Sequence, residues 1–255
     1  MRWRGRLRAS VFAVCVVFMP GAVAPAAGDE HKDGPPAWDY GRDLGPEHWA
    51  EIDPTFATCG TGQRQSPIDI SGEVSSDAPP VSFAYRAGPA SVVNLGHTAQ
   101  VNVAPGNSLE FGGETYELVQ FHFHTPSENT FKGTHHPLEI HFVHRDGAGR
   151  LAVVSVVVRA GDAGPLDLLP MPGEVGGTVA LDAPLNPADL LPDDTGYLTF
   201  EGSLTTPPCS EGVQWIVMRS HAVAGEVAIA HIAALIGPNN RPTHPLNGRL
   251  LQAGE

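Results

Sequence analysis

The sequence has few basic residues for its length. Lysine and arginine together number 15 in 255 residues, against 28 aspartates and glutamates, and the formal net charge is −13. A surface of this sign repels the phosphates of nucleic acids and the headgroups of anionic membranes. We therefore expect no nucleic-acid partner.

Long apolar runs are missing as well. The longest, Val11 to Met19, follows four arginines in the first eight residues and precedes small residues up to Ala27. It is too short to cross a bilayer as a helix. This order of segments is typical of a secretory signal peptide. We expect residues 1–27 to be a signal peptide, residues 28–255 to form a single domain without stable membrane insertion, and the mature chain to be secreted or periplasmic.

Cysteine is scarce. Of three cysteines, Cys15 lies in the expected signal peptide, which leaves Cys59 and Cys209. In a chain that enters an oxidising compartment, such a pair favours a disulfide. Two unpaired buried thiols are the alternative. Because Cys209 lies four residues after Thr205, a bridge would also tether the Thr205–Pro208 segment.

Turn-forming residues are abundant, with 24 prolines and 29 glycines, and helical patterns are sparse. A helical turn is expected at 186–191, and a longer helix only at 226–236. Short apolar or alternating runs between turns are typical of strands, and the fold class is therefore mainly β. The run 151–158 is apolar on both faces, which indicates a central strand. The expected strands are Ser91–Val93, Ala99–Val103, Tyr116–His124, Leu138–His144, Leu151–Arg159 and Val213–Ser220.

The most informative motif is Gln120-Phe121-His122-Phe123-His124, with His141 seventeen residues after His124. Side chains alternate across a strand, so His122 and His124 project from one face. His141 and Glu139 share a face of the next predicted strand. Three imidazoles without a fourth protein ligand are typical of catalytic zinc, whose remaining position stays open. We expect Zn²⁺ to be held by His122, His124 and His141.

Two polar residues accompany these ligands. Gln120 precedes His122 by two residues on the same strand face, and Glu139 precedes His141 in the same way. A ligating imidazole needs an acceptor for its second nitrogen, so we expect Gln120 and Glu139 to supply it. Ordinary polar pairing at a strand end is the alternative.

A different metal site must also be weighed. His122, His124 and Glu128 match the first metal motif of cupin dioxygenases, in which the glutamate is a ligand. However, Tyr116 stands where that motif has a glycine. The sequence also contains no matching second motif with a proline, a glycine and a spaced histidine.

Beyond this motif, the chain resembles the α-class carbonic anhydrases over nearly the whole expected mature sequence. The resemblance implies a catalytic domain at 28–255, built on a large, twisted, mostly antiparallel central sheet with small peripheral helices. It implies zinc-dependent, reversible hydration of carbon dioxide to bicarbonate and a proton. The matching segments are Trp38–Gly41, Gly45–Trp49, Gln65–Ile68, Asn94–His97, Gln120–Glu128, Leu138–His144, Gly202–Trp215 and Asn239–Arg249.

The resemblance also implies roles for residues outside the triad. Zinc-bound hydroxide would attack carbon dioxide, and Thr205 would accept its hydrogen bond while donating to an ionised Glu128. His97 matches the proton-shuttle histidine of the family, and its ordinary pKa suits exchange with buffer. Residues expected to order the connecting waters are Tyr40, Asn94 and Gln100.

The expected substrate, carbon dioxide, is small and apolar, so its pocket should be apolar too. Taken singly, most of the matching residues would be assigned to the core. The residues that match the pocket wall of the family are Val143, Val153, Leu204, Thr206, Val213 and Trp215.

The chain departs from the family pattern at three positions. Leu95 stands where many animal members have an asparagine that lines the water network. Asn129 and Phe200 replace a histidine and a tyrosine of a buried polar network, and the loss of both partners together is milder than the loss of one. A catalytically inactive, carbonic anhydrase-like binding module is a further alternative, although such relatives usually lose a ligand histidine. A homodimer is compatible with the resemblance, since bacterial relatives often dimerise.

Overall fold

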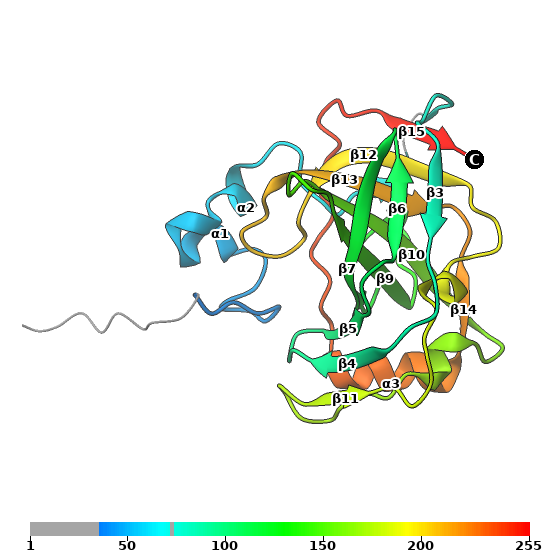
Figure 1. Cartoon of the computed structure of the whole chain (residues 1–255). Coiled ribbons are helices and arrows are strands. Elements are labelled where there is room, and N and C mark those ends of the chain that lie inside the picture. Colours follow the sequence, from blue (N-terminus) through cyan, green and yellow to red (C-terminus); the bar gives the residue numbers. More distant parts are fainter. Residues whose placement is uncertain (1–35, 72–73) are drawn as a thin grey trace, which may run out of the picture. The chain divides into compact units, whose positions relative to one another are not determined.

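The computed structural model describes residues 36–71 and 74–255 (Figure 1). The expected signal peptide and Cys15 lie outside the described residues. The helices are α1 (Trp49–Ile52), α2 (Thr58–Thr61) and α3 (Glu226–Ile236), and the 3-10 turns are η1 (Pro54–Phe56), η2 (Pro165–Leu168) and η3 (Pro187–Leu190). The strands are β1 (Asp69–Ile70), β2 (Val74–Ser75), β3 (Val81–Ala84), β4 (Ala90–Asn94), β5 (Ala99–Val103), β6 (Ser108–Phe111), β7 (Glu114–His124), β8 (Thr130–Phe131), β9 (Leu138–Arg145), β10 (Leu151–Gly161), β11 (Thr178–Ala180), β12 (Tyr197–Ser203), β13 (Glu211–Met218), β14 (Ala222–Gly225) and β15 (Leu251–Gly254).

Thirteen of the described strands form one sheet. Its main order is β11-β4-β5-β7-β9-β10-β13-β12-β15-β2, while β14 pairs with β10, and β6 pairs with both β3 and β7. Neighbours are antiparallel except where β10 meets β13 and β14 and where β15 meets β2. The mainly β, mostly antiparallel fold expected from the sequence is confirmed. Among the described helices, none is long and apolar enough to cross a membrane.

The strand β10 lies in the middle of this sheet. Residues 152–158 are all buried, as the run of apolar residues on both faces predicts. One core cluster contains Val154, Val156 and Val158, together with the buried side of α3. A second cluster, on the other side, contains Val153 and Trp215.

The register of β7 and β9 determines the position of the histidines. His122 lies directly opposite His141, and Phe121 lies opposite Phe142. Directly opposed residues of antiparallel strands project from the same face. The histidines therefore share one face of the β7–β9 pair, and the phenylalanines share the other.

The predicted disulfide is present. Cys59 of α2 is bonded to Cys209, which follows β12, across a separation of 150 residues. Both residues are buried beside Trp49. The backbone amide of Cys209 donates to the carbonyl of Thr206 at 2.8 Å, so the bridge fastens the Thr205–Pro208 loop to the N-terminal segment.

Candidate metal centre

The three histidines converge on one point. One nitrogen from each of His122, His124 and His141 lies within 4.8 Å of the others. Their ring centroids are 5.1, 5.5 and 4.5 Å apart; His122 lies edge-to-face with both other rings, and the rings of His124 and His141 are tilted to each other. Among the histidine, cysteine and acidic side chains of the described residues, these three histidines are the group arranged so that it could hold a metal ion.

Each imidazole has a protein acceptor for its second nitrogen. Oε1 of Gln120 lies 2.9 Å from Nδ1 of His122, and Oε1 of Glu139 lies 2.9 Å from Nε2 of His141. The sequence did not indicate the third acceptor, the backbone carbonyl of Asn239, which lies 2.8 Å from Nδ1 of His124. These contacts place the protons on the outer nitrogens and leave the inner ones as acceptors.

The inner nitrogens fit a metal. Nε2 of His124 is buried and has no hydrogen-bond partner among the described residues, and a buried polar atom without a partner is costly. Burial lowers the pKa of His124 to about 4. Burial and the neighbouring His124 and His141 hold the pKa of His122 well below its usual range. Neutral imidazoles are the form that binds zinc.

Glu139 is a buried carboxylate with many donors. It accepts hydrogen bonds from the amides of Glu128 and Asn129 at 2.6 and 2.9 Å, from Nδ2 of Asn129 at 2.7 Å, and from the hydroxyl of Ser155. Burial alone would raise its pKa, but His141 and these donors outweigh burial and lower the pKa to about 2. Glu139 is therefore an anion that fixes the ring of His141.

Glu128 is also fully buried, but it has fewer donors. The amide of Arg241 donates to its Oε1 at 2.9 Å. Burial raises its pKa to about 7, although His141, the Arg241 amide and the Thr205 hydroxyl lower it. The Thr205 hydroxyl is therefore near enough to lower the pKa of Glu128. Oε2 of Glu128 has no hydrogen-bond donor among the described residues. Oε2 lies 3.8 Å from Nδ1 of His141.

His97 lies in the turn between β4 and β5. The amide of Leu95 donates to the carbonyl of Thr98 at 2.8 Å, and Gly96 has φ +85°, which suits glycine. The His97 ring packs on Trp38 with centroids 4.7 Å apart, and burial lowers its pKa. Nδ2 of Asn239 donates to the His97 carbonyl at 2.8 Å, so Asn239 joins this turn to His124.

The three residues expected to order water differ in their contacts. The hydroxyl of Tyr40 is buried without a partner among the described residues, which leaves it available to water. Gln100 lies opposite His122 across β5 and β7, and its Nε2 donates to Asn102 at 2.7 Å. Asn94, by contrast, is occupied by the protein, since Nδ2 donates to the Pro172 carbonyl at 3.1 Å and Oδ1 accepts from Gly96 at 2.8 Å. Asn94 thus holds the turn that carries His97.

The expected apolar wall forms one cluster beside the histidines. The ring of Trp215 lies edge-to-face with that of His141, with centroids 4.9 Å apart. Val143 and Val153 are cross-strand partners on β9 and β10. Thr206 follows Thr205 in the loop between β12 and β13 and is half-buried. The members that belong to the second core cluster or pack against it are Val143, Val153, Leu204, Val213 and Trp215.

The departures from the family pattern have different structural outcomes. Asn129 keeps a buried polar network, because it donates to Glu139 and its Oδ1 accepts from the amide of Ile68 at 3.2 Å. Phe200 stacks on Trp215 with an angle of 8° between the rings. Leu95 is 39% exposed in the turn beside His97.

Two residues that contact the site, Asn239 and Arg241, have no local sequence pattern that indicates their roles. Asn239 and Arg241 lie in an irregular segment after α3, and their amide and carbonyl groups contact Glu128 and His124. The guanidinium of Arg241 is buried, donates to the carbonyls of Ser66 and Cys59, and lies over Trp49. The match of 239–249 to the family pattern was the available sign of their importance.

Comparison with known proteins gives a consistent result. A family model described as eukaryotic-type carbonic anhydrase matches residues 44–254. A carbonic anhydrase of Pectobacterium carotovorum is 40% identical over 218 residues, which cover 84% of this chain and 89% of the relative. The structure of the α-carbonic anhydrase from Thermovibrio ammonificans with the inhibitor sulfanilamide has a TM-score of 0.83 and 40% identity, covering 86% of this chain and 100% of that one.

The same fold also occurs in a neighbour whose structure was solved with a different ligand. Dioscorin complexed with ascorbate has a TM-score of 0.77 and 31% identity, with coverage of 86% of this chain and 98% of that one. The chemistry must therefore be argued from the residues of the site, because the fold alone does not fix the ligand.

Proposed function

Since the chain belongs to the eukaryotic-type, α-class carbonic anhydrase family, whose members are lyases that hydrate carbon dioxide, we propose that it interconverts carbon dioxide and bicarbonate with zinc as cofactor. One observation carries this proposal. Three imidazoles converge, of which those of His124 and His141 are buried and that of His122 is half-buried; each is hydrogen-bonded through its outer nitrogen, and the inner nitrogen of His124 has no partner among the described groups. When bound, zinc supplies a Lewis acid that makes water nucleophilic near neutral pH, a property for which carbonic anhydrases are themselves the standard example.

Thr205 and Glu128 orient the attacking oxygen. A hydroxyl that donates its proton to a carboxylate has only lone pairs left for a second partner, so Thr205 accepts from the nucleophile and selects its direction. This role requires the anionic form of Glu128; burial raises the pKa of this carboxyl to about 7, and His141, the Arg241 amide and Thr205 act in the opposite direction. The disulfide and the hydrogen bond from Cys209 to Thr206 hold the loop in place.

The apolar wall contacts the substrate, and His97 removes the proton that the reaction releases. Carbon dioxide has no hydrogen-bond donor, and the wall formed by Val143, Val213 and Trp215 suits it. His97 lies in a turn that is partly exposed and takes the released proton toward buffer. Water held by Tyr40 and Gln100 connects His97 to the centre.

Zinc removal and restoration test the proposal. Zinc-loaded protein should hydrate carbon dioxide, lose the activity with its zinc after chelation, and regain it in proportion to zinc added back. Sulfanilamide should inhibit the loaded protein. Folded protein with stoichiometric zinc and no hydration activity would instead support the binding module. Bound iron with oxygen uptake would support the cupin alternative.

We also infer that the chain is exported. The disulfide supports this, because such bonds persist in oxidising compartments. N-terminal sequencing of the mature protein should give a start near residue 28. A mature chain that begins at Met1 would contradict the inference.

A further inference from the structure

One polar side chain lies in the middle of the apolar strand β10. Ser155 is the only residue between Leu151 and Val158 that is not alanine or valine, and it is completely buried. A hydroxyl group that is buried without a hydrogen bond is unfavourable. The hydroxyl of Ser155 therefore needs a partner inside the protein.

The register of β9 and β10 directs Ser155 toward the metal centre. Ser155 lies directly opposite His141, and opposed residues of antiparallel strands project from the same face. Glu139 precedes His141 by two residues on that face, so it is the diagonal neighbour of Ser155, within reach of a long side chain. The Ser155 hydroxyl donates to Oε1 of Glu139.

Ser155 shares its acceptor atom with a candidate zinc ligand. The oxygen that receives the serine hydroxyl, Oε1 of Glu139, also lies 2.9 Å from Nε2 of His141. Ser155 thus contacts the atom that accepts the outer proton of this imidazole. The hydrogen bond of Ser155 goes to the carboxylate, so its effect on His141 passes through Glu139.

The other donors to this carboxylate come from an irregular segment. Oε2 of Glu139 accepts from the amides of Glu128 and Asn129, and Oε1 accepts from Nδ2 of Asn129. Both donor residues lie between β7 and β8, in a segment without helix or strand. Ser155, by contrast, belongs to a strand that is paired on both sides, with β9 and with β13. A group on a strand is held more precisely than one on a loop.

We propose that Ser155 is a positioning residue of the metal centre, which keeps Oε1 of Glu139 at the outer nitrogen of His141 and thereby slows metal release. The inference rests on the proposed zinc function. Without the hydroxyl, the donors of the irregular segment alone would hold the carboxylate, whose last torsion is broad. Oε1 would then leave the imidazole more often, and a ligand histidine that lacks its acceptor binds metal more weakly.

The rate of zinc release tests this role. Ser155→Thr keeps the hydroxyl, whereas Ser155→Val replaces it with a methyl group in a side chain that is branched in the same way. The measurement is the transfer of zinc from the loaded full chain to an excess of EDTA. Ser155→Val should release zinc about three- to tenfold faster than Ser155→Thr, below the roughly 10- to 100-fold effect of a residue that contacts the ligand itself.

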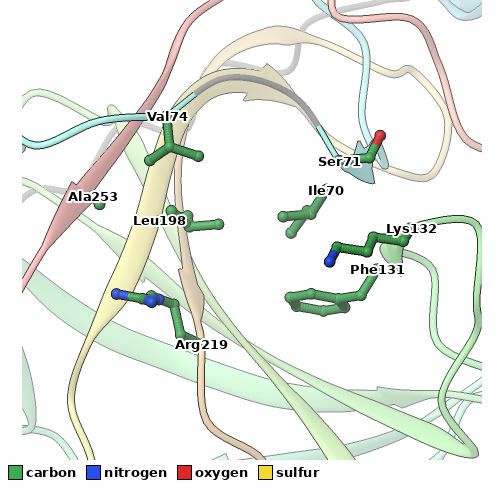
Figure 2. A pocket seen from close by; sticks show the side chains of 8 residues that line it. All are labelled: Ile70, Ser71, Val74, Phe131, Lys132, Leu198, Arg219 and Ala253. Carbon is green, nitrogen blue, oxygen red and sulfur yellow. The ribbon is translucent and has the colours of Figure 1, made fainter.

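Ser71→Ala is the matched control for the loss of a hydrogen bond between a serine and a carboxylate. The Ser71 hydroxyl donates to Oδ2 of Asp69 at 2.5 Å. Figure 2 shows Ser71 in the lining of a separate hollow, and the eight residues labelled there include none that is assigned to the metal centre. Ser71→Ala should release zinc at the wild-type rate. Faster release from this variant would contradict a specific role of Ser155.

Equal release rates in Ser155→Thr and Ser155→Val would overturn the proposal, whether both match the wild-type rate or both exceed it. The hydroxyl would then have no part, and only the volume of the side chain would matter. Denaturant unfolding of the zinc-free variants is measured alongside. A Ser155→Val protein that is less stable than Ser155→Thr but releases zinc at the same rate would show a purely structural serine.

These outcomes are separate from the outcome for the proposed function. Wild-type protein that binds zinc without hydrating carbon dioxide would contradict the proposed function. The release rates of the threonine and valine variants would still decide the role of Ser155, because they are measured without the reaction.

Discussion

The two faces of the β7–β9 pair differ in what holds their side chains. On the metal face, each imidazole is fixed by one directional hydrogen bond of 2.8 or 2.9 Å, and the Glu139 carboxylate is fixed by several. On the opposite face, side chains are fixed by packing, as in Phe121 and Phe142 with ring centroids 5.1 Å apart. Substitutions on the two faces should therefore separate chemistry from stability. The fully buried packing residues are Phe121, Phe123, Ile140 and Phe142.

The largest effect is expected on the metal face. His141→Ala removes one of three ligands, and bound zinc should fall from one per chain to nearly none, with hydration slowed by more than about 10³-fold. The matched control is His144→Gln, since His144 is a buried histidine of the same strand on the other face. It should retain zinc. Equal zinc loss in both variants would mean that the two faces are not separable.

The reverse outcome is expected for the packing face. Phe142→Ala should lower the free energy of unfolding by about 3 to 5 kcal/mol through the lost burial and the cavity left behind. Zinc per folded chain should be unchanged, as measured by metal analysis of the soluble fraction alongside denaturant unfolding. A variant of normal stability that has lost its zinc would contradict this division.

His144 gives the packing face a pH dependence. Burial lowers its pKa to about 3, while its Nε2 lies 2.6 Å from the Tyr85 hydroxyl. Below about pH 6.5, His144 takes up a proton in the unfolded chain but not in the folded chain. The contribution of neutral His144 to the free energy of unfolding is therefore fully present above that pH and is lost as the pH falls toward 3. The slope is about 1.4 kcal/mol per pH unit for one such group.

The measurement is denaturant unfolding of wild-type protein and His144→Gln at pH 7, 6 and 5. Other histidines, such as the buried His124 and the half-buried His244, have lowered pKa values too, so the difference between the two proteins isolates His144. The variant should have the shallower dependence below pH 6. Parallel curves would show that His144 is protonated in the fold or does not contribute.

The sequence predicted the two faces because the period of a strand is two residues. Gln120, His122 and His124 follow this period on one strand, and Glu139 and His141 follow it on the next, so no tertiary information was needed for either strand. The pairing of β7 with β9, which sets His122 opposite His141, was not predicted. Nine of the described strands were not predicted, since eight of them are only two to four residues long and β12 is interrupted by the polar Glu201. The strands that were missed are β1, β2, β3, β6, β8, β11, β12, β14 and β15.

The remaining contacts depend on positions far apart in the chain. The acceptor of His124 is a backbone carbonyl 115 residues away, and a carbonyl has no residue-type signature. Asn94 was expected to order water, whereas its side-chain amide is hydrogen-bonded to the Pro172 carbonyl and the Gly96 amide. Residue identity thus indicated a polar role without indicating which partner would satisfy it.

The smallest effect is expected at His97, which belongs to a turn outside both faces. His97→Ala should leave bound zinc and stability unchanged, because its ring lies in a partly exposed turn and packs on Trp38, but it should slow hydration about five- to tenfold in dilute buffer. Added imidazole should restore the rate by carrying the proton instead. If the slow variant does not respond to imidazole while binding zinc normally, the proton leaves by another route. The loss would then be assigned to the turn that Asn239 holds against His124.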